Sequence, residues 1–160
     1  MSIKMLVMDV DGTLTDGCIY VGAEGEMMKA FHVQDGYAIA HKLPVHDIVP
    51  VIITGRSSEI VRRRATELKI REIHQGVSDK LAKLKEIAAQ YGAAPGEIAY
   101  IGDDENDLDC IRFCGHTACP ADAVGEIQTV VDYVCKREGG RGAVREFIDR
   151  LLNEAPERNT

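Results

Sequence analysis

Short apolar runs recur along the chain, separated by segments in which apolar residues return every three or four positions. The runs lack the alternation with polar residues that marks a half-solvated strand, which is typical of strands buried on both faces. They lie at residues 6–8, 49–53, 70–74 and 98–101, with shorter candidates at 117–118 and 133–134. Strands that alternate with helices predict an α/β fold, a three-layer Rossmann-like parallel sheet with helices on both faces.

The helix starts are marked by residues that favour capping positions. Asp35 is expected to cap a helix that runs to about Leu43, and Ser57 to cap the helix that follows the second strand. Ser78 is expected to open a helix that ends before Gly92, a residue suited to the position after a helix. Further helices are predicted at residues 107–113 and 143–152.

A small β-hairpin is predicted at about residues 18–31, directly after the first strand and its acidic turn. A lone hairpin is marginally stable in water, so this one is expected to pack against something, such as another subunit. Residues 1–152 are expected to form a single domain, which includes a glycine-rich segment and helix at 139–152. The polar residues 153–160 are expected to form a flexible tail.

The composition argues against some classes of partner and favours one cellular compartment. The chain has 160 residues and a formal net charge of −7, which argues against nonspecific binding to nucleic acid. Its apolar runs fall short of the roughly 18 residues of a membrane span, so no membrane partner is expected. Five cysteines and the absence of a secretory signal before the first strand favour reduced thiols in the cytoplasm.

Two carboxylates follow the first strand, at Asp9 and Asp11, with Gly12 directly after them. Ligands of open α/β sheets bind at the carboxyl ends of the strands, where both residues are expected to lie. Carboxylates this close repel each other unless something positive lies between them. A divalent cation would serve, and oxygen ligands of this kind suit Mg²⁺. An acidic turn without a ligand is the alternative.

Two other strands end in polar clusters. Thr54 and Gly55 follow the strand at 49–53, and a group of acids at 103–107 follows the strand at 98–101. In a parallel sheet all these clusters meet at one edge, which Lys80 can reach from the start of its helix. Several acids, one hydroxyl and one lysine suit phosphoryl transfer through a carboxylate nucleophile.

These motifs occur in the order that the phosphatases of the haloacid dehalogenase superfamily have, and the chain resembles that family over nearly its whole length. The resemblance rests on Asp9-x-Asp11-Gly12-Thr13, Thr54-Gly55, Lys80 and Gly102-Asp103-Asp104-x-x-Asp107. It implies that Asp9 is the nucleophile, which forms an aspartyl-phosphate, and that Asp11 protonates the leaving oxygen and then activates water. It also implies Mg²⁺ held by Asp9, the Asp11 carbonyl and Asp103.

The same resemblance assigns the supporting residues. Thr54 and Lys80 would bind phosphoryl oxygens, while Asp107 and Asp104 would hold Lys80 or metal-bound water from behind. The segments between the motifs hold only a hairpin, short helices and a short strand, so the chain resembles the members of the superfamily that lack a cap domain.

Within those members, the chain resembles the phosphatases of 3-deoxy-D-manno-octulosonate 8-phosphate. This resemblance rests on residues 15–17, 31–37, 53–56, 75–80 and 139–146. It implies a homotetramer, with hairpins that form a barrel between subunits and a neighbour's glycine-rich C-terminal segment that closes each site. The implied substrate contacts are Asp11, His32, Val33, Gln34, Asp35, Gly36, Arg56, Arg64 and Lys80. Arginine suits the sugar carboxylate because its guanidinium is a two-pronged donor.

Some alternatives stay open. His32 and Gln34 stand where that subgroup has Asn and Arg, which bears on the identity of the sugar; a nine-carbon keto-sugar acid 9-phosphate is the alternative substrate. A non-catalytic tetramerisation module related to nucleotide-sugar synthetases, or a phosphotransferase, are the alternative functions. A zinc site is a further hypothesis, with Cys110, Cys114, His116 and Cys119 as its ligands, set against plain buried thiols.

Overall fold

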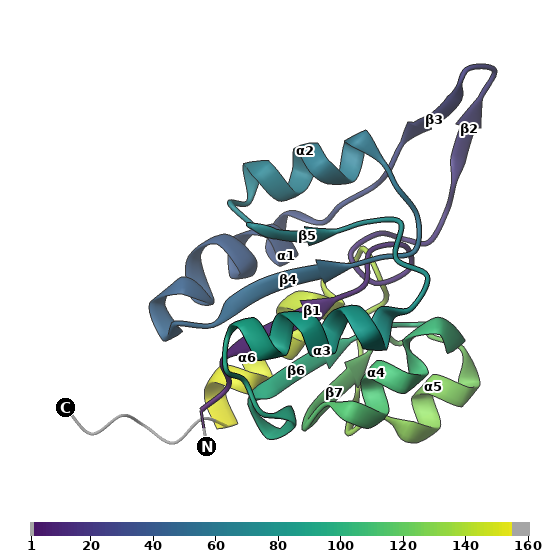
Figure 1. The fold of residues 1–160 in the computed structure, drawn as a ribbon. Helices are drawn as coiled ribbons and strands as arrows, with labels where there is room; N and C mark the ends of the chain where they lie inside the picture. Colours follow the sequence, from purple (N-terminus) through teal and green to yellow (C-terminus); the bar gives the residue numbers. More distant parts are fainter. Residues whose placement is uncertain (1, 155–160) are drawn as a thin grey trace.

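One parallel sheet organises the molecule (Figure 1). The computed structural model describes residues 2–154. The strands lie in the order β5-β4-β1-β6-β7-β8. Their bounds are Met5–Met8 for β1, Val49–Ile53 for β4, Glu72–His74 for β5, Ile98–Ile101 for β6, His116–Cys119 for β7 and Tyr133–Val134 for β8. The predicted parallel sheet is confirmed, and each predicted strand of the sheet is present.

Strand β1 lies at the centre, between β4 and β6, and none of its side chains is exposed. Met5 and Val7 pack into one hydrophobic layer, whereas Leu6 and Met8 pack into the other. A strand covered on both faces needs apolar residues at every position, which explains the uninterrupted run.

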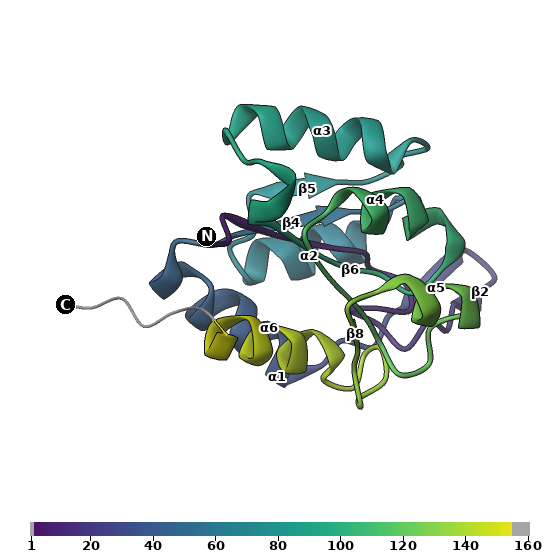
Figure 2. The ribbon, with the colours of Figure 1, turned by 90° about the horizontal axis from the view of Figure 1, so that it is seen from below.

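Helices cover both faces of the sheet, as Figure 2 shows from below. One layer contains α1 (Val33–Tyr37), a π-helical turn (Ala38–Lys42), α2 (Glu59–Glu67) and α6 (Ala143–Glu154). The other contains α3 (Lys80–Gln90), α4 (Leu108–Phe113) and α5 (Gly125–Val130). Short 3-10 turns lie at Pro44–His46, Pro95–Glu97 and Glu105–Asp107. The three-layer prediction is therefore confirmed.

The helix starts differ from the predicted ones in detail. His32, not Asp35, caps α1, because its Nδ1 accepts a hydrogen bond from the Gln34 amide. Asp79, not Ser78, caps α3 through its carboxylate. Helix α2 follows Ser58 instead of Ser57, and the Ser58 hydroxyl does not cap the helix. Helix α5 was not predicted, since no side chain caps its start.

A two-stranded hairpin, β2 (Tyr20–Gly22) and β3 (Gly25–Met28), projects from the body of the molecule (Figure 1). It falls within the predicted range 18–31. Within residues 2–154, no cap domain is inserted between the strands of the sheet. Of the predicted tail at 153–160, residues 153–154 belong to α6, and 155–160 lie outside the described residues.

The glycine-rich segment 139–142 packs against the loop after β1 of its own chain. The Gly140 amide donates to the Thr13 carbonyl at 3.1 Å. A Cβ on Gly139 would lie 1.9 Å from the Gly12 carbonyl oxygen, so only glycine fits there. These contacts fix the backbone of the segment on its own chain, and its closure of a neighbour's site stays a prediction.

Gly139→Ala should destabilise the protein, because the new methyl group must displace the loop after β1. We expect the free energy of unfolding to fall by about 2 kcal/mol, the usual cost of overpacking. Urea denaturation would measure it. Gly125→Ala is the matched control, since a Cβ at Gly125 meets nothing within 4 Å. Equal stability of the two variants would contradict the close packing of Gly139.

Candidate active site

A buried cluster of charges lies where the central strands end. Lys80, in the first turn of α3, donates to Asp9 Oδ1 at 2.9 Å and to Asp107 Oδ1 at 2.8 Å. All three side chains are almost fully buried. The parallel sheet thus brings together residues from three distant segments, because the carboxyl ends of neighbouring strands share one edge.

Asp107 holds this edge in place through both of its oxygens. Its Oδ1 accepts from Lys80 and from the Tyr100 hydroxyl, the latter at 2.6 Å. Its Oδ2 accepts from the amides of Asp103 at 3.0 Å and Asp104 at 3.3 Å. Since four donors occupy this carboxylate, it positions Lys80 and the loop after β6 and has little capacity left for another ligand.

Asp9, Asp103 and Asp107 bring three carboxylate oxygens within 4.8 Å of one another. Because Asp107 is occupied by its donors, Asp9 and Asp103 are the two that can offer oxygens to a cation. Thr13 orients Asp103 by donating to its Oδ1 at 3.1 Å. A pair of carboxylates beside backbone carbonyls is the ligand set that Mg²⁺ prefers, so the residues fit a hard divalent cation.

Crowding of the carboxylates raises their pKa values. Burial, followed by the nearby Asp107, raises the pKa of Asp9 to about 6 despite Lys80. Burial and the charge of Asp9 raise the pKa of Asp103 to about 8. Burial by itself lowers the pKa of Lys80, but Asp9 and Asp107 outweigh it and raise that pKa overall. Both shifts favour the protonated carboxyl groups, so a cation that binds Asp9 and Asp103 would displace protons from them.

The loop after β1 is tightly turned. The amides of residues 13–15 all donate to the Val10 carbonyl. Gly12 has φ +90°, and a Cβ there would lie 2.0 Å from Asp103 Oδ2. Glycine is thus required twice, by the backbone conformation and by the approach of Asp103. Thr54, buried at the end of β4, is held by backbone bonds to His74 and Val77.

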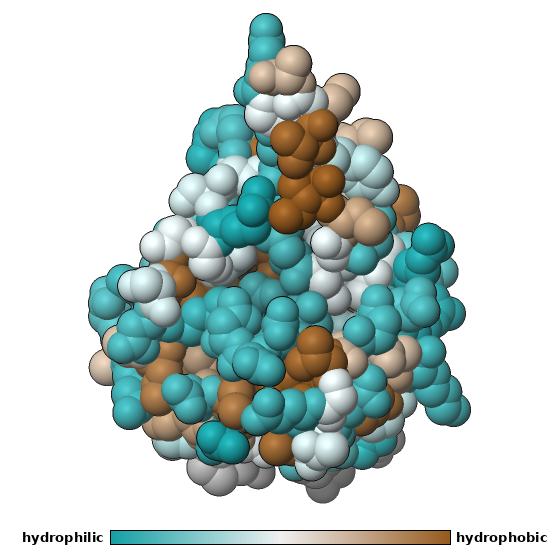
Figure 3. Space-filling model, turned by 90° about the vertical axis from the view of Figure 1, so that its right-hand side faces the viewer, coloured by the Kyte–Doolittle hydropathy of each residue, from teal (hydrophilic) through white to brown (hydrophobic). Residues whose placement is uncertain are grey.

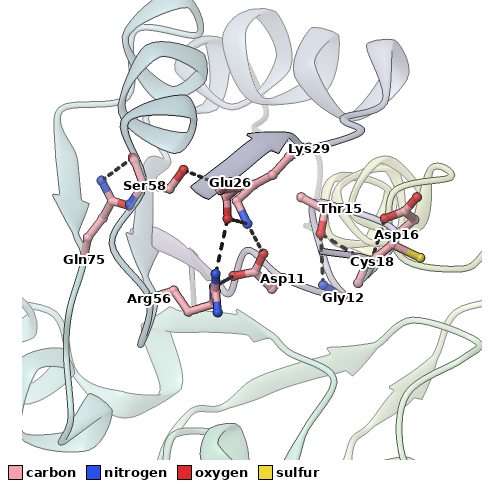
Figure 4. A network of polar contacts seen from close by, with 11 residues as sticks. Asp11, Gly12, Thr15, Asp16, Cys18, Glu26, Lys29, Arg56, Ser58 and Gln75 are labelled. Carbon is pink, nitrogen blue, oxygen red and sulfur yellow. Dashed lines mark hydrogen bonds and ion pairs between the residues drawn. The ribbon is translucent and has the colours of Figure 1, made fainter. Parts of the chain in front are cut away.

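Asp11 turns towards Lys29 and Arg56 at the base of the hairpin (Figure 4). Lys29 Nζ lies 2.5 Å from Asp11 Oδ1 and 3.2 Å from Glu26 Oε2. Arg56 bonds Glu26 at 3.3 Å and brings its Nε to 3.9 Å from Asp11 Oδ2. The sequence prediction missed Lys29 and Glu26. Their one signal was their place on, or directly after, the returning strand β3, a segment that has no recognisable motif.

Other predicted substrate residues lie apart from Asp9 and Asp11. His32, Asp35, Gly36 and Arg64 line a pocket whose remaining wall is apolar. Asp35 Oδ2 and Arg64 Nε are buried there without a hydrogen-bond partner among the described residues. Arg64 binds Glu67 and Gln34 accepts from Arg137, whereas Val33 and Asp104 are exposed. Of these residues, Asp104 alone is bonded to the charged cluster in the described part of the chain, through its amide and Asp107 Oδ2.

The zinc hypothesis is not supported. Within residues 2–154, the acidic group at Asp9 is the only one that gathers three possible metal ligands. Cys110 and Cys119 are buried, and burial raises their thiol pKa values to about 12 and about 11. They behave as small hydrophobic residues.

Comparison with known proteins identifies the family. A family model described as haloacid dehalogenase-like hydrolase matches residues 53–148. The chain belongs to the haloacid dehalogenase-like hydrolases. The 3-deoxy-D-manno-octulosonate 8-phosphate phosphatase KdsC of Escherichia coli K12 is 43% identical over 151 residues, 94% of this chain and 80% of that protein.

Two solved structures of such hydrolases superpose closely. The 3-deoxy-D-manno-octulosonate 8-phosphate phosphatase from Yersinia pestis has a TM-score of 0.91 and 43% identity, over 94% of this chain and 81% of that one. The enzyme of the same name from Moraxella catarrhalis, in complex with magnesium, phosphate and KDO, has a TM-score of 0.90 and 43% identity, over 94% and 86%. None of the helices described here is long and apolar enough to span a bilayer.

The raised carboxyl pKa values predict a pH-dependent stability. Without metal, the folded chain retains protons that the unfolded chain releases, so the free energy of unfolding should fall as pH rises from about 4 to about 8. Mg²⁺ should raise the melting temperature more at about pH 8 than at about pH 5, because it replaces those protons.

Differential scanning fluorimetry with and without Mg²⁺ would measure both effects. Asp103→Asn is the comparison variant, since it removes the carboxyl whose pKa is about 8. It should show a flatter pH dependence and a weaker response to Mg²⁺. A metal-free melting temperature that rises through this window would contradict the prediction.

Proposed function

We propose that this hydrolase is a Mg²⁺-dependent phosphomonoesterase that converts 3-deoxy-D-manno-octulosonate 8-phosphate to the free sugar acid and phosphate, a step of lipopolysaccharide biosynthesis. The observation that carries the proposal is the meeting of Asp9, Lys80 and Asp103 at one buried strand edge, with Asp11 beside it. Two relatives that are named as phosphatases of this sugar phosphate, each 43% identical over 94% of the chain, support the choice of substrate.

In the first step, Asp9 attacks the phosphorus atom. Lys80 occupies Asp9 Oδ1, which leaves Oδ2 as the nucleophilic oxygen. The Asp9–phosphorus bond forms as the bond to the sugar oxygen breaks, and Asp11 gives its proton to that oxygen. A bound Mg²⁺ would offset the negative charge of the phosphoryl group and of the two aspartates that hold it.

In the second step, water hydrolyses the aspartyl-phosphate. Asp11, now without its proton, accepts one from water as the water oxygen bonds to phosphorus and the bond to Asp9 breaks. Phosphate leaves, and Asp9 and Asp11 return to their starting states. Thr54 and Lys80 would bind phosphoryl oxygens during both steps. An intact set of Asp9, Asp11, Lys80 and Asp103 favours this reaction over a non-catalytic module.

Arg56 is the residue best placed to meet the sugar carboxylate. It stands at the mouth of the site, and half of its side chain is exposed beside Asp11. A guanidinium fork binds a carboxylate through two parallel hydrogen bonds. His32, Val33, Gln34, Asp35, Gly36 and Arg64 remain proposed contacts of the sugar.

Asp9→Asn should abolish phosphate release, since an amide cannot form the intermediate. We expect a loss of roughly 10³-fold or more in kcat. A phosphate-release assay with the eight-carbon and nine-carbon sugar acid phosphates would measure it and rank the substrates by kcat/KM. Asp109→Asn is the control, because Asp109 lies on α4 outside the cluster. Chelation of Mg²⁺ should stop the wild type.

Retained activity of Asp9→Asn would refute the aspartyl-phosphate route. Failure of the wild type on every sugar phosphate would instead favour the tetramerisation module. Transfer of the phosphoryl group to an added alcohol in preference to water would favour a phosphotransferase.

The hairpin supports a further part of the proposal, a homotetramer held by hairpins of neighbouring subunits. Large hydrophobic side chains gather on this projecting element, as Figure 3 shows. They are Ile19, Tyr20, Val21, Met27 and Met28, and Val21 and Met27 are about 70% exposed. Contiguous apolar surface of this kind marks protein interfaces. The five cysteines are free, which accords with a reducing compartment, and we place the protein in the cytoplasm.

Charge on the hairpin should break this assembly. Val21→Glu combined with Met27→Glu puts carboxylates on the apolar surface, so the double variant should elute as a smaller species than the wild type. Size-exclusion chromatography with light scattering would give both masses. Val45→Glu is the control, as Val45 is 76% exposed and lies outside the hairpin. An unchanged mass for the double variant would exclude the hairpin as the interface.

A further inference from the structure

The base of the hairpin reaches into the active site, although its tip projects away (Figures 1 and 4). Lys29, just after β3, has a side chain that is only 1% exposed and lies between the carboxylates of Asp11 and Glu26. A buried ammonium group is costly unless it is paired and hydrogen-bonded. This lysine meets both conditions, so its position is well determined by its two partners.

The two oxygens of Asp11 have different surroundings. Oδ1 is bound by Lys29, whereas Oδ2 faces the Nε of Arg56 at 3.9 Å, which is beyond hydrogen-bond distance. Oδ2 is therefore the oxygen that is available to carry a proton. About one fifth of the Asp11 side chain is exposed, so that oxygen can meet a substrate or a water molecule.

Glu26 fixes Lys29 in turn. Its Oε1 accepts from the Ser58 hydroxyl at 2.6 Å, and its Oε2 meets Lys29 and Arg56. The hydrogen bond from Ser58, then those from Lys29 and Arg56, lower the pKa of Glu26 against the effect of its burial. Glu26 therefore stays ionised and connects the hairpin to the residue that precedes α2. The Ser58 hydroxyl is used here, which explains why it does not cap that helix.

We propose that Lys29 is a positioning residue for the reaction. Held by Glu26, it binds Oδ1 of Asp11 and so directs Oδ2 towards the site, where Oδ2 gives its proton to the leaving oxygen and later takes one from water. The inference rests on the proposed function, because it acts through the acid and base role of Asp11. It assigns the charged base of the hairpin a part in catalysis that is separate from the apolar surface of its strands.

Lys29→Met tests the proposal, because methionine fills a similar volume without the charge. Its kcat on the sugar phosphate should fall roughly 10-fold to 100-fold, part of the usual effect of a general acid or base, while its Mg²⁺ affinity is unchanged. Lys83→Met is the matched control, since Lys83 pairs at 2.8 Å with Glu86, whose side chain is 57% exposed, and forms no ion pair with Asp11.

A substrate with a different leaving group distinguishes a positioning role of Lys29 from a general loss of structure in Lys29→Met. With para-nitrophenyl phosphate, whose leaving group needs no protonation, the first step should stay fast in Lys29→Met while hydrolysis of the aspartyl-phosphate becomes slow. Stopped-flow measurement should then show a burst of nitrophenol that the wild type lacks. Equal losses on both substrates without a burst would overturn the proposal, as would a kcat within twofold of the wild type.

A double-mutant cycle completes the test. In an Asp11→Asn background, Lys29→Met should cause no further loss in kcat, because its partner has already lost its function. Additive losses would overturn the proposal. If Lys29→Met does not fold, Lys29→Gln serves instead, because its side-chain amide is a donor of slightly shorter reach. It should retain more activity than Asp11→Asn. Full activity of Asp11→Asn would instead refute the proposed function itself.

Discussion

Repulsion among buried carboxylates governs the arrangement of the site. Asp9, Asp103 and Asp107 converge where β1 and β6 end, and Lys80 is the only cation that reaches both Asp9 and Asp107 among the described residues. One positive charge cannot balance three negative ones, so the cluster retains a proton or takes a cation. The folded state tolerates this excess because Asp107 receives hydrogen bonds on both oxygens. A site that favours a divalent cation follows from that imbalance, and only with the cation bound would it accept an anionic phosphoryl group.

The backbone allows the carboxylates to approach so closely. At Gly12 a side chain would overlap Asp103, and at Gly102 it would overlap Asp107. Gly102 directly follows β6, and Gly12 lies in the loop after β1. At both positions the absence of a side chain leaves room for a carboxylate. The hairpin adds a second charged layer, in which Lys29 and Glu26 face Asp11 from the opposite side. Asp11 and Asp9 thus have different partners, since Lys29 binds Asp11 whereas Lys80 binds Asp9.

The sheet, its helical layers and the meeting of Asp9, Lys80 and Asp103 could be predicted, because strand order and hydrophobic runs determine which residues share an edge. Lys29 could not, since its contact with Asp11 depends on the angle at which the hairpin returns to the body. Helix α5 could not be predicted from a capping residue, because no side chain caps its start. The position of Gly139 against the Gly12 carbonyl was also not predicted. A glycine-rich sequence does not indicate whether the segment is mobile or packs against another loop.

The contact between Gly140 and Thr13 joins regions near opposite ends of the chain. The loop after β1 therefore has its full set of contacts only when residues 139–142 have been made and have docked. Contacts of such high sequence separation form late in folding, since closing a long loop costs entropy before any contact repays it. Nascent chains that already contain β1 and its aspartates consequently lack this support of the loop until residues 139–140 have been made.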